Sequence, residues 1–230
     1  MIIKSFGASS SGNCHMISDG VTALLLDAGI PFKQLQVAMG FNLSSVQGVL
    51  LTHEHMDHAK SVKDLMKRGI TVYSSAGTFD ALGVYSHRAK VVKPLEGVLA
   101  GSMSVLPIEA EHDAREPLGF VVTSTVTNEK LLYLTDSFYC KFDVRGLTHM
   151  IVECNYCEEL LCASEVDRVL KARIRMSHMS LETLEIMLRS MDKSKLQKIC
   201  LTHLSDRHSD EAMIKDRVQR LTGVEVEIFT

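Results

Sequence analysis

Three histidines and two carboxylates crowd the segment LLTHEHMDHA, which covers residues 51–60. In an extended chain His53 and His55 point to the same side, so both can bind one metal ion. Asp57 and His58 follow where the chain turns, and they can point toward a second ion. Imidazole nitrogens and carboxylate oxygens are the ligands that Zn, Mn and Fe prefer. The spacing therefore favours a metal site over a solvated histidine-rich loop.

Two later segments repeat the pattern of an apolar strand that ends in Leu-Thr and a ligand-type residue. VLLTH ends at His53, LYLTD ends at Asp136 and ICLTH ends at His203. Open α/β folds bind ligands at the carboxyl ends of their strands. These three strand ends therefore predict a site assembled along one edge of a sheet.

Apolar or β-branched runs bounded by Gly, Asp, Asn or Ser are typical of strands. They predict strands at residues 1–6, 22–29, 46–52, 69–75, 102–110, 118–126, 130–135, 149–155, 197–202 and 225–230. Helical periodicity predicts helices at 33–39, 58–68, 158–171, 180–191 and 209–221, the fourth with Ser180 as its N-cap. No low-complexity linker or long charge run divides the chain. We therefore expect one α/β domain over residues 1–230.

Composition and charge limit the classes of function. The chain has 230 residues, of which 46% are hydrophobic, and a formal charge of −3. A sizeable core is expected, and a polyanionic partner would have to meet a local basic patch because there is no global basic field. The N-terminus lacks the pattern of a signal peptide and no run is long enough to cross a membrane, so we expect a soluble cytoplasmic protein.

The cysteines show no disulfide framework. They are spaced irregularly in a chain too long to need covalent staples, and we expect reduced thiols. The spacing of Cys154, Cys157 and Cys162 suggests a zinc knuckle, but a second Cys/His pair at matching spacing is missing. The six are Cys14, Cys140, Cys154, Cys157, Cys162 and Cys200.

The segment HEHMDH resembles the metallo-β-lactamase superfamily, whose H-x-H-x-D-H motif appears here in full. The resemblance implies a four-layer αβ/βα sandwich with two facing mixed sheets, outer helices and a dinuclear metal site. It also implies that His112 joins His53 and His55 on one ion. By the same resemblance Asp136 bridges both ions, and His203 joins two motif residues on the second. The implied metal ligands are His53, His55, Asp57, His58, His112, Asp136 and His203.

Two positions separate the chain from other branches of that superfamily. Position 136 is Asp where the antibiotic-hydrolysing branch has Cys, and position 55 is His where the diiron oxygen-reducing branch has Glu. The resemblance therefore implies a hydrolase of the phosphodiesterase, thioesterase or lactonase branches. The cofactors expected are two divalent ions, Zn or Mn, with Fe as a further candidate.

A narrower resemblance lies between the ligand positions. SSSGNCH, IVECNYCEELL, RIRMSHMSLE and LTHLSDRHS are similar to segments of YycJ-type (WalJ-like) proteins and, more loosely, of tRNA 3′-processing endonucleases. Those families act on phosphodiesters, and their extra histidine, here His178, lies at the scissile phosphate. An imidazolium there could protonate the leaving oxygen, while the alternative is a histidine that caps the helix near Ser180. Asp57 and His178 are the expected catalytic residues. Met176 and Ser177 stand where the families have Gly before this histidine.

Several polar residues are candidates for substrate contact. By resemblance Asn13 lies near the site, and His208 follows the last ligand by five residues. Basic residues precede His178, and Lys60, Lys63 and Lys67 recur at helical spacing after the motif. Each basic run has solvated surface charge as its alternative. The expected substrate-binding residues are His178, His208, Asn13, Arg173 and Arg175, with Arg168 and Lys171 in the same basic cluster.

The best hypothesis is a dinuclear metal-dependent hydrolase that cleaves phosphodiester bonds, as a DNA or RNA exonuclease. A phosphodiesterase for a cyclic nucleotide or another small phosphodiester is the first alternative, and a thioesterase or lactonase is a weaker one. A scaffold without catalysis and a single-iron redox protein are alternatives from other classes. The expected partner is a nucleic acid or nucleotide, without a membrane, and a homodimer is a further candidate assembly.

Overall fold

The computed structural model describes residues 1–230 and divides into two compact units. The first unit contains Met1–Glu109 and Ala114–Glu129, and the second contains Ala110–Asp113 and Lys130–Thr230. The strands form two mixed sheets flanked by helices. No helix is long and apolar enough to span a bilayer.

The first unit contains a six-stranded sheet whose strands follow the order of the chain. They are β1 (Ile2–Ser9), β2 (Gly12–Ser18), β3 (Ala23–Leu26), β4 (Val46–Leu50), β5 (Thr71–Ser74) and β6 (Ala89–Val91). The first three are antiparallel, and β3 to β6 are parallel. Parallel strands need crossover connections, which are usually helical, and strands covered on both faces read as continuous apolar runs. The sequence ALLL of β3 fits this rule, since Leu24, Leu25 and Leu26 are fully buried.

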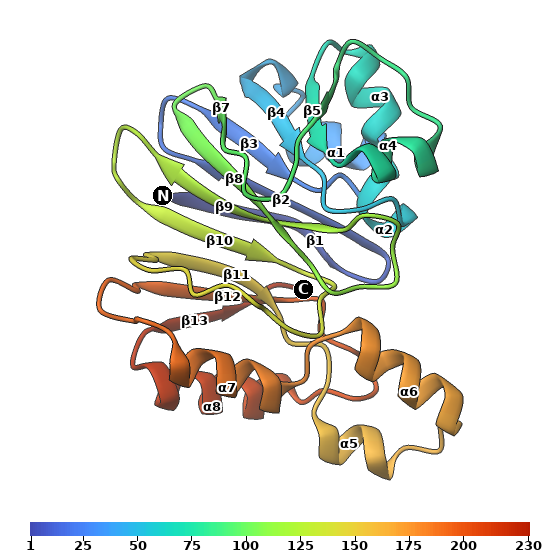
Figure 1. The fold of residues 1–230 in the computed structure, drawn as a ribbon, viewed down its shortest axis with the longest axis vertical. Coiled ribbons are helices and arrows are strands. Elements are labelled where there is room, and N and C mark those ends of the chain that lie inside the picture. The colour runs from blue at the N-terminus through green and yellow to red at the C-terminus, as the bar shows by residue number, and fades with distance from the viewer. The chain divides into compact units, whose positions relative to one another are not determined.

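Short helices follow the parallel strands of this sheet. They are α1 (Phe32–Ala38), the 3₁₀ turn Leu43–Ser45, α2 (Met56–Ala59), α3 (Val62–Lys67) and α4 (Ala76–Leu82). Figure 1 shows α1, α3 and α4 beside β4 and β5. Their buried side chains, among them Leu35, Leu65 and Phe79, pack with strand residues into one apolar core. The same unit carries the antiparallel strands β7 (Val98–Ala100), β8 (Met103–Glu109) and β9 (Leu118–Ser124) of the second sheet.

The second unit carries four parallel strands of the second sheet. In spatial order they are β13 (Glu225–Ile228), β12 (Lys198–Thr202), β11 (His149–Glu153) and β10 (Lys130–Leu134). The helices are α5 (Glu158–Ala163), α6 (Arg168–Ser177), α7 (Leu181–Ser190) and α8 (Glu211–Thr222), with α7 and α8 beside β12 and β13 in Figure 1. Because the strands are parallel, the residues after β10, β11 and β12 reach the same edge.

All ten predicted strands are present, whereas the helix predictions need two corrections. The helix predicted at 158–171 is two helices, because Ser164 ends α5 and the Asp167 side chain caps a new helix by accepting from the amides of Val169 and Leu170. The helix predicted at 58–68 is likewise interrupted between α2 and α3. Strands β2, β6 and β7 and helix α4 are additional, and Ser180 caps α7 as predicted. The expectation of a single domain stays a prediction.

A close backbone approach fixes the loop that follows β3. The amide of Ala28 donates to His58 O at 2.7 Å, and the amide of Gly29 donates to Asn13 O at 2.8 Å. A Cβ at Gly29 would lie 1.7 Å from Asp57 O, so no side chain fits there without displacing the start of α2. The loop, β2 and α2 therefore form one closely packed layer.

We expect Gly29→Ala to lower the free energy of unfolding by about 1–3 kcal/mol or more, because the added methyl forces backbone apart. Gly97→Ala is the matched control, since its Cβ would meet nothing closer than Val105 O at 3.9 Å. The control should stay within about 0.5 kcal/mol of the parent protein. Urea unfolding followed by circular dichroism measures both, and equal stability of the two variants would contradict the packing described.

Candidate metal centre

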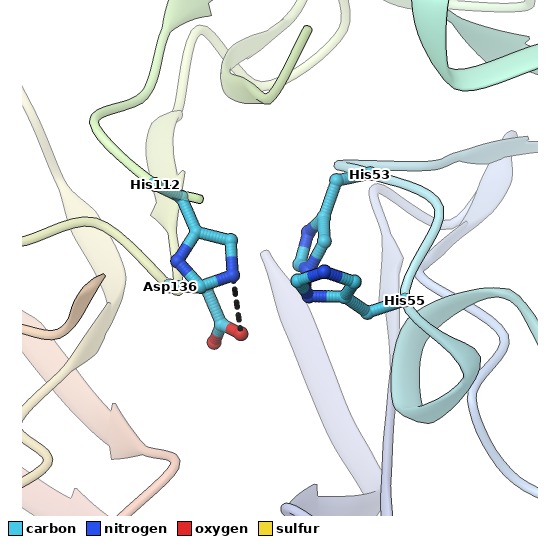
Figure 2. A group of neighbouring side chains, drawn as sticks. All are labelled: His53, His55, His112 and Asp136. Atoms are coloured by element: carbon cyan, nitrogen blue, oxygen red, sulfur yellow. Dashed lines mark hydrogen bonds and ion pairs between the residues drawn. The ribbon is translucent and has the colours of Figure 1, made fainter. Parts of the chain in front are cut away.

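The H-x-H-x-D-H segment of the first unit places its side chains close together. His53 Nε2 lies 3.1 Å from His55 Nδ1, and the His53 and His58 ring centroids are 4.2 Å apart. Figure 2 shows the rings of His53 and His55 side by side, and the two rings meet edge to face. Asp57 Oδ2 lies 3.5 Å from His58 Nε2. The segment thus gathers three imidazoles and a carboxylate, as the sequence predicted.

A buried carboxylate orients the last histidine of this segment. Asp27 follows β3 and is completely buried. Its Oδ1 accepts from the amide and hydroxyl of Thr52 at 2.8 and 3.0 Å, and its Oδ2 lies 2.8 Å from His58 Nδ1. With Nδ1–H donating to Asp27, His58 keeps the lone pair on Nε2, which is the tautomer that a metal ligand needs. Sequence reasoning missed Asp27, although its position directly after an apolar strand resembles that of Asp136.

Asn13 contacts the same imidazole. Its amide nitrogen donates to Ser9 O at 3.1 Å and lies 3.1 Å from His58 Nε2, while its Oδ1 is buried without a hydrogen-bond partner. Asn13 follows the turn between β1 and β2, whose residue Gly12 packs against the Gly29 carbonyl. The residue therefore lies beside the coordinating face of His58, and its role toward substrate stays a prediction.

The second unit holds a second cluster at the carboxyl ends of its parallel strands. Ligand atoms of Asp136, Glu153, His178 and His203 all lie within 4.8 Å of one another. His112 Nε2 lies 3.6 Å from Asp136 Oδ2, the ion pair dashed in Figure 2. His112 Nδ1 donates to Ser177 O at 2.9 Å. This cluster therefore contains all three ligands predicted beyond the H-x-H-x-D-H motif, with His178 beside them.

Glu153 organises that cluster, although sequence reasoning gave it no role. It is fully buried at the end of β11. Its Oε1 lies 2.6 Å from His178 Nδ1 and 3.1 Å from His203 Nδ1, and its Oε2 accepts from the amides of Ser137 and Met179 at 3.1 and 3.2 Å. Both imidazoles are thus held by Nδ1. The signal in the sequence was a carboxylate ending an apolar strand, as at Asp27.

The pKa shifts of His112 and His178 run in opposite directions, which fits their different expected roles as metal ligand and proton donor. Burial lowers the pKa of His112, although Asp136 opposes this. Burial also disfavours the charged form of His178, but the Glu153 carboxylate outweighs it and raises the pKa of that ring. Burial would raise the pKa of Glu153, yet the charge and hydrogen bond of His178 and the hydrogen bond of His203 lower it. Glu153 therefore shifts His178 toward its protonated form, the direction that suits an acid rather than a ligand.

His178 does not cap the helix that follows it. Ser180 is the N-cap of α7, accepting from the Thr183 amide, while His178 ends α6 with extended backbone. The isolated bridge between Tyr156 and Ser180, together with the Met179 amide on Glu153, ties this loop to the end of β11. Met176 and Ser177 complete the last turn of α6, so no glycine is needed before the histidine.

The other predicted substrate residues have partners inside the second unit. Arg173 pairs with Asp113 at 3.0 Å, and Arg175 pairs with Glu158 through two nitrogens. Lys171 donates to two main-chain carbonyls, those of Cys162 and Ser164. His208 lies between β12 and α8, where burial lowers the pKa of its ring and its Nδ1 lies 3.4 Å from Ser205 Oγ. Substrate contact by these residues stays a prediction.

The six cysteines are free.

Known proteins with similar sequences are nucleases by name. A family model described as a beta-lactamase superfamily domain matches residues 22–204. Exodeoxyribonuclease YycJ of Bacillus anthracis is 27% identical over 86% of this chain and 80% of its own length. Exodeoxyribonuclease WalJ of Streptococcus pneumoniae is 25% identical over 96% of this chain and 89% of its own.

A solved structure confirms the fold predicted from the sequence. The metallo-β-lactamase fold protein YhfI of Bacillus subtilis superposes with a TM-score of 0.75 and 17% identity, over 99% of this chain and 95% of that one. This fold, together with the His and Asp clusters, indicates divalent metal binding. Neutral imidazoles with fixed tautomers and buried carboxylates suit such ions.

Asp27→Asn should weaken metal binding by about 10–100-fold, because the amide no longer fixes the tautomer of His58. A competition titration of the purified protein with zinc and a chromophoric chelator measures the affinity. Asp64→Asn on the surface of α3 is the matched control, since Asp64 pairs only with exposed Lys67. Unchanged zinc affinity in the Asp27 variant would refute the orienting role.

Proposed function

The chain belongs to the metallo-β-lactamase superfamily, and we propose that it is a metal-dependent hydrolase that cleaves phosphodiester bonds in DNA or RNA from an end. The observation that carries this proposal is His178 held by buried Glu153 beside the metal-ligand cluster of the second unit. A nucleic-acid strand leaves as an alkoxide that must be protonated, and His178 is placed to supply that proton. The names of the two exodeoxyribonucleases support the same reaction.

Seven side chains are proposed to hold two divalent ions, Zn or Mn. We assign His53, His55 and His112 to one ion and Asp57, His58 and His203 to the other, with Asp136 shared. When bound, such a pair supplies an activated water and a charge that holds the phosphoryl oxygen. The buried carboxylates support the assignment: Asp27 and Glu153 each hold a ligand histidine by Nδ1.

The remaining steps fall to the protein. Glu153 fixes the His178 imidazole by Nδ1 and raises the pKa of the ring, and in its protonated form the ring can donate a proton from Nε2 to the leaving oxygen. Glu153 is buried, which disfavours its charge, but the four hydrogen bonds that it accepts and the charge of His178 lower its pKa and so favour the carboxylate form. Asp57, at the start of α2, is proposed to act in catalysis by orienting the attacking water as well as by binding metal.

A small phosphodiester such as a cyclic nucleotide is the second candidate substrate. It is favoured by the ion pairs of Arg173 and Arg175, because guanidinium groups already bound to carboxylates are less available to a long polyanion. The net charge of −3 points the same way. Neither observation bears on the bond that is cleaved.

A substrate panel separates the two candidates. We expect the protein loaded with Mn or Zn to shorten end-labelled single-stranded DNA or RNA progressively, and to lose this activity with a chelator and regain it with metal. Cyclic nucleotides and bis-p-nitrophenyl phosphate are assayed beside it under the same conditions. Turnover of cyclic nucleotides with intact oligonucleotides would overturn the nuclease proposal and select the small substrate.

His178→Ala should slow cleavage of an oligonucleotide by about 10²–10⁴-fold, because the alkoxide leaving group loses its proton donor. The same variant should lose far less on a p-nitrophenyl ester of thymidine phosphate, whose nitrophenolate leaves without a proton. Metal content, measured by atomic emission, should stay at the level of the parent protein.

Ser180→Ala is the matched control for damage to the same loop. Loss of this N-cap should cost about 1 kcal/mol of stability and affect the two substrates alike. If His178→Ala behaved as this control does, with equal and modest losses on both substrates, the proton-donor role would be wrong.

A further inference from the structure

A pocket of about 290 Å³ lies in the first unit next to the H-x-H-x-D-H segment. Glu54 and Met56, which line it, alternate along the chain with His53 and His55, so the pocket is one residue away from two candidate metal ligands. None of the proposed ligands lines it. Its lining residues are Glu54, Met56, Ala59, Lys60, Val62, Lys63, Ala81 and Leu82.

The pocket combines an apolar surface with two lysines. Met56 is 58% exposed although it is a large hydrophobic residue beside a cluster of charged groups. Lys60 donates to Ser11 O at 3.3 Å, and Lys63 has no ion pair or hydrogen bond. By contrast Lys67 on the same helix pairs with Asp64. Neither lysine at the pocket therefore forms an ion pair with a carboxylate, although Glu54 lines the same pocket.

Glu54 adds an acceptor that lacks a donor. Its Oε1 accepts from the Arg115 amide at 2.8 Å, whereas its Oε2 is buried without a hydrogen-bond partner. A buried acceptor of this kind is costly until a donor reaches it. An acyl chain offers no such donor, whereas the amino or imino group of a nucleobase does.

We infer that this pocket binds one nucleotide of the substrate strand, with its base against Met56 and Leu82 and its phosphate near Lys60 and Lys63. Methionine packs well on aromatic rings, and single strands are held by bases on apolar platforms within cationic grooves. A base paired in a duplex cannot enter, so the occupant is a single-stranded or frayed end. Glu54 Oε2 accepts from the base, favouring bases that present an amino group. The inference rests on the proposed function and names its substrate class.

Equilibrium binding of a single-stranded DNA tests the pocket directly. The probe is a fluorescein-labelled decamer with phosphorothioate linkages, which resist cleavage, added to the metal-loaded protein and followed by anisotropy. Lys63→Ala and Ala81→Glu alter exposed lining positions, and each should weaken binding by roughly tenfold, the lower part of the range for loss of one stacked base. Lys67→Ala is the matched control and should bind as the parent does. Far-UV circular dichroism confirms that the variants fold.

A scan with abasic residues tests whether a base occupies the pocket. Each base of the decamer is replaced in turn by tetrahydrofuran. In the parent protein one position near an end should lose about tenfold in affinity, and in Ala81→Glu the same replacement should cost nothing further, because the pocket is already closed to the base. The inference would be overturned if both pocket variants bound the decamer as the parent protein does. It would also be overturned if no abasic position lost less affinity in Ala81→Glu than in the parent protein.

Turnover of bis-p-nitrophenyl phosphate, which has no base, separates this inference from the proposed function. Phosphodiester turnover without a coupled abasic position would defeat the pocket alone. Absence of any phosphodiester turnover would overturn the proposed function and this inference with it.

Discussion

A buried carboxylate that accepts a hydrogen bond from an imidazole is the interaction on which both clusters depend. Asp27 does this for His58 in the first unit, and Glu153 does it for His178 and His203 in the second. Each carboxylate is fully buried, so its charge would be prohibitive without several donors. Thr52 supplies them to Asp27, and main-chain amides supply them to Glu153. Leaving such a buried group without one of its donors costs about 1–3 kcal/mol or more, because the group is charged.

The backbone at the strand ends shows a second constraint. Asp27, Asp136 and His203 all have positive φ angles, between 49° and 58°. Residues with a Cβ rarely adopt this conformation, and it costs of order 1–3 kcal/mol unless the surroundings enforce it. Asp27 and His203 directly follow a buried strand and Asp136 lies two residues after the end of one, where the chain turns to bring a side chain to the sheet edge. The cost is tolerated because the same turn delivers the functional group.

The sequence predicted the elements with strong periodic patterns and the residues that match a motif. Each apolar run assigned to a strand is a strand in the structure, and Asp136 and His203 were singled out because they end such runs and match the ligand positions that the resemblance implies. Asp27 and Glu153 also end strands, but a single carboxylate there is usually a turn residue, and only their buried hydrogen bonds reveal their role. The break before Asp167 was missed because apolar residues kept a helical period across it, although the side chain of Asp167 is itself a helix-start signal. Which strands pair, and in what order, is a long-range property that local patterns do not contain.

Charge pairing explains why nearby cations can differ in function. Arg175 lies in α6 shortly before His178, yet its guanidinium is paired with Glu158 and lowers the pKa of that carboxyl. Such a pair stabilises the join between α5 and α6, and a phosphate could reach the guanidinium only by competing with the carboxylate. Lys63 has no such competitor. A cation that is already paired with a carboxylate of the same protein attracts a substrate anion less than an unpaired cation does. The absence of an internal partner is therefore a better guide to substrate contact than proximity in sequence to a catalytic residue.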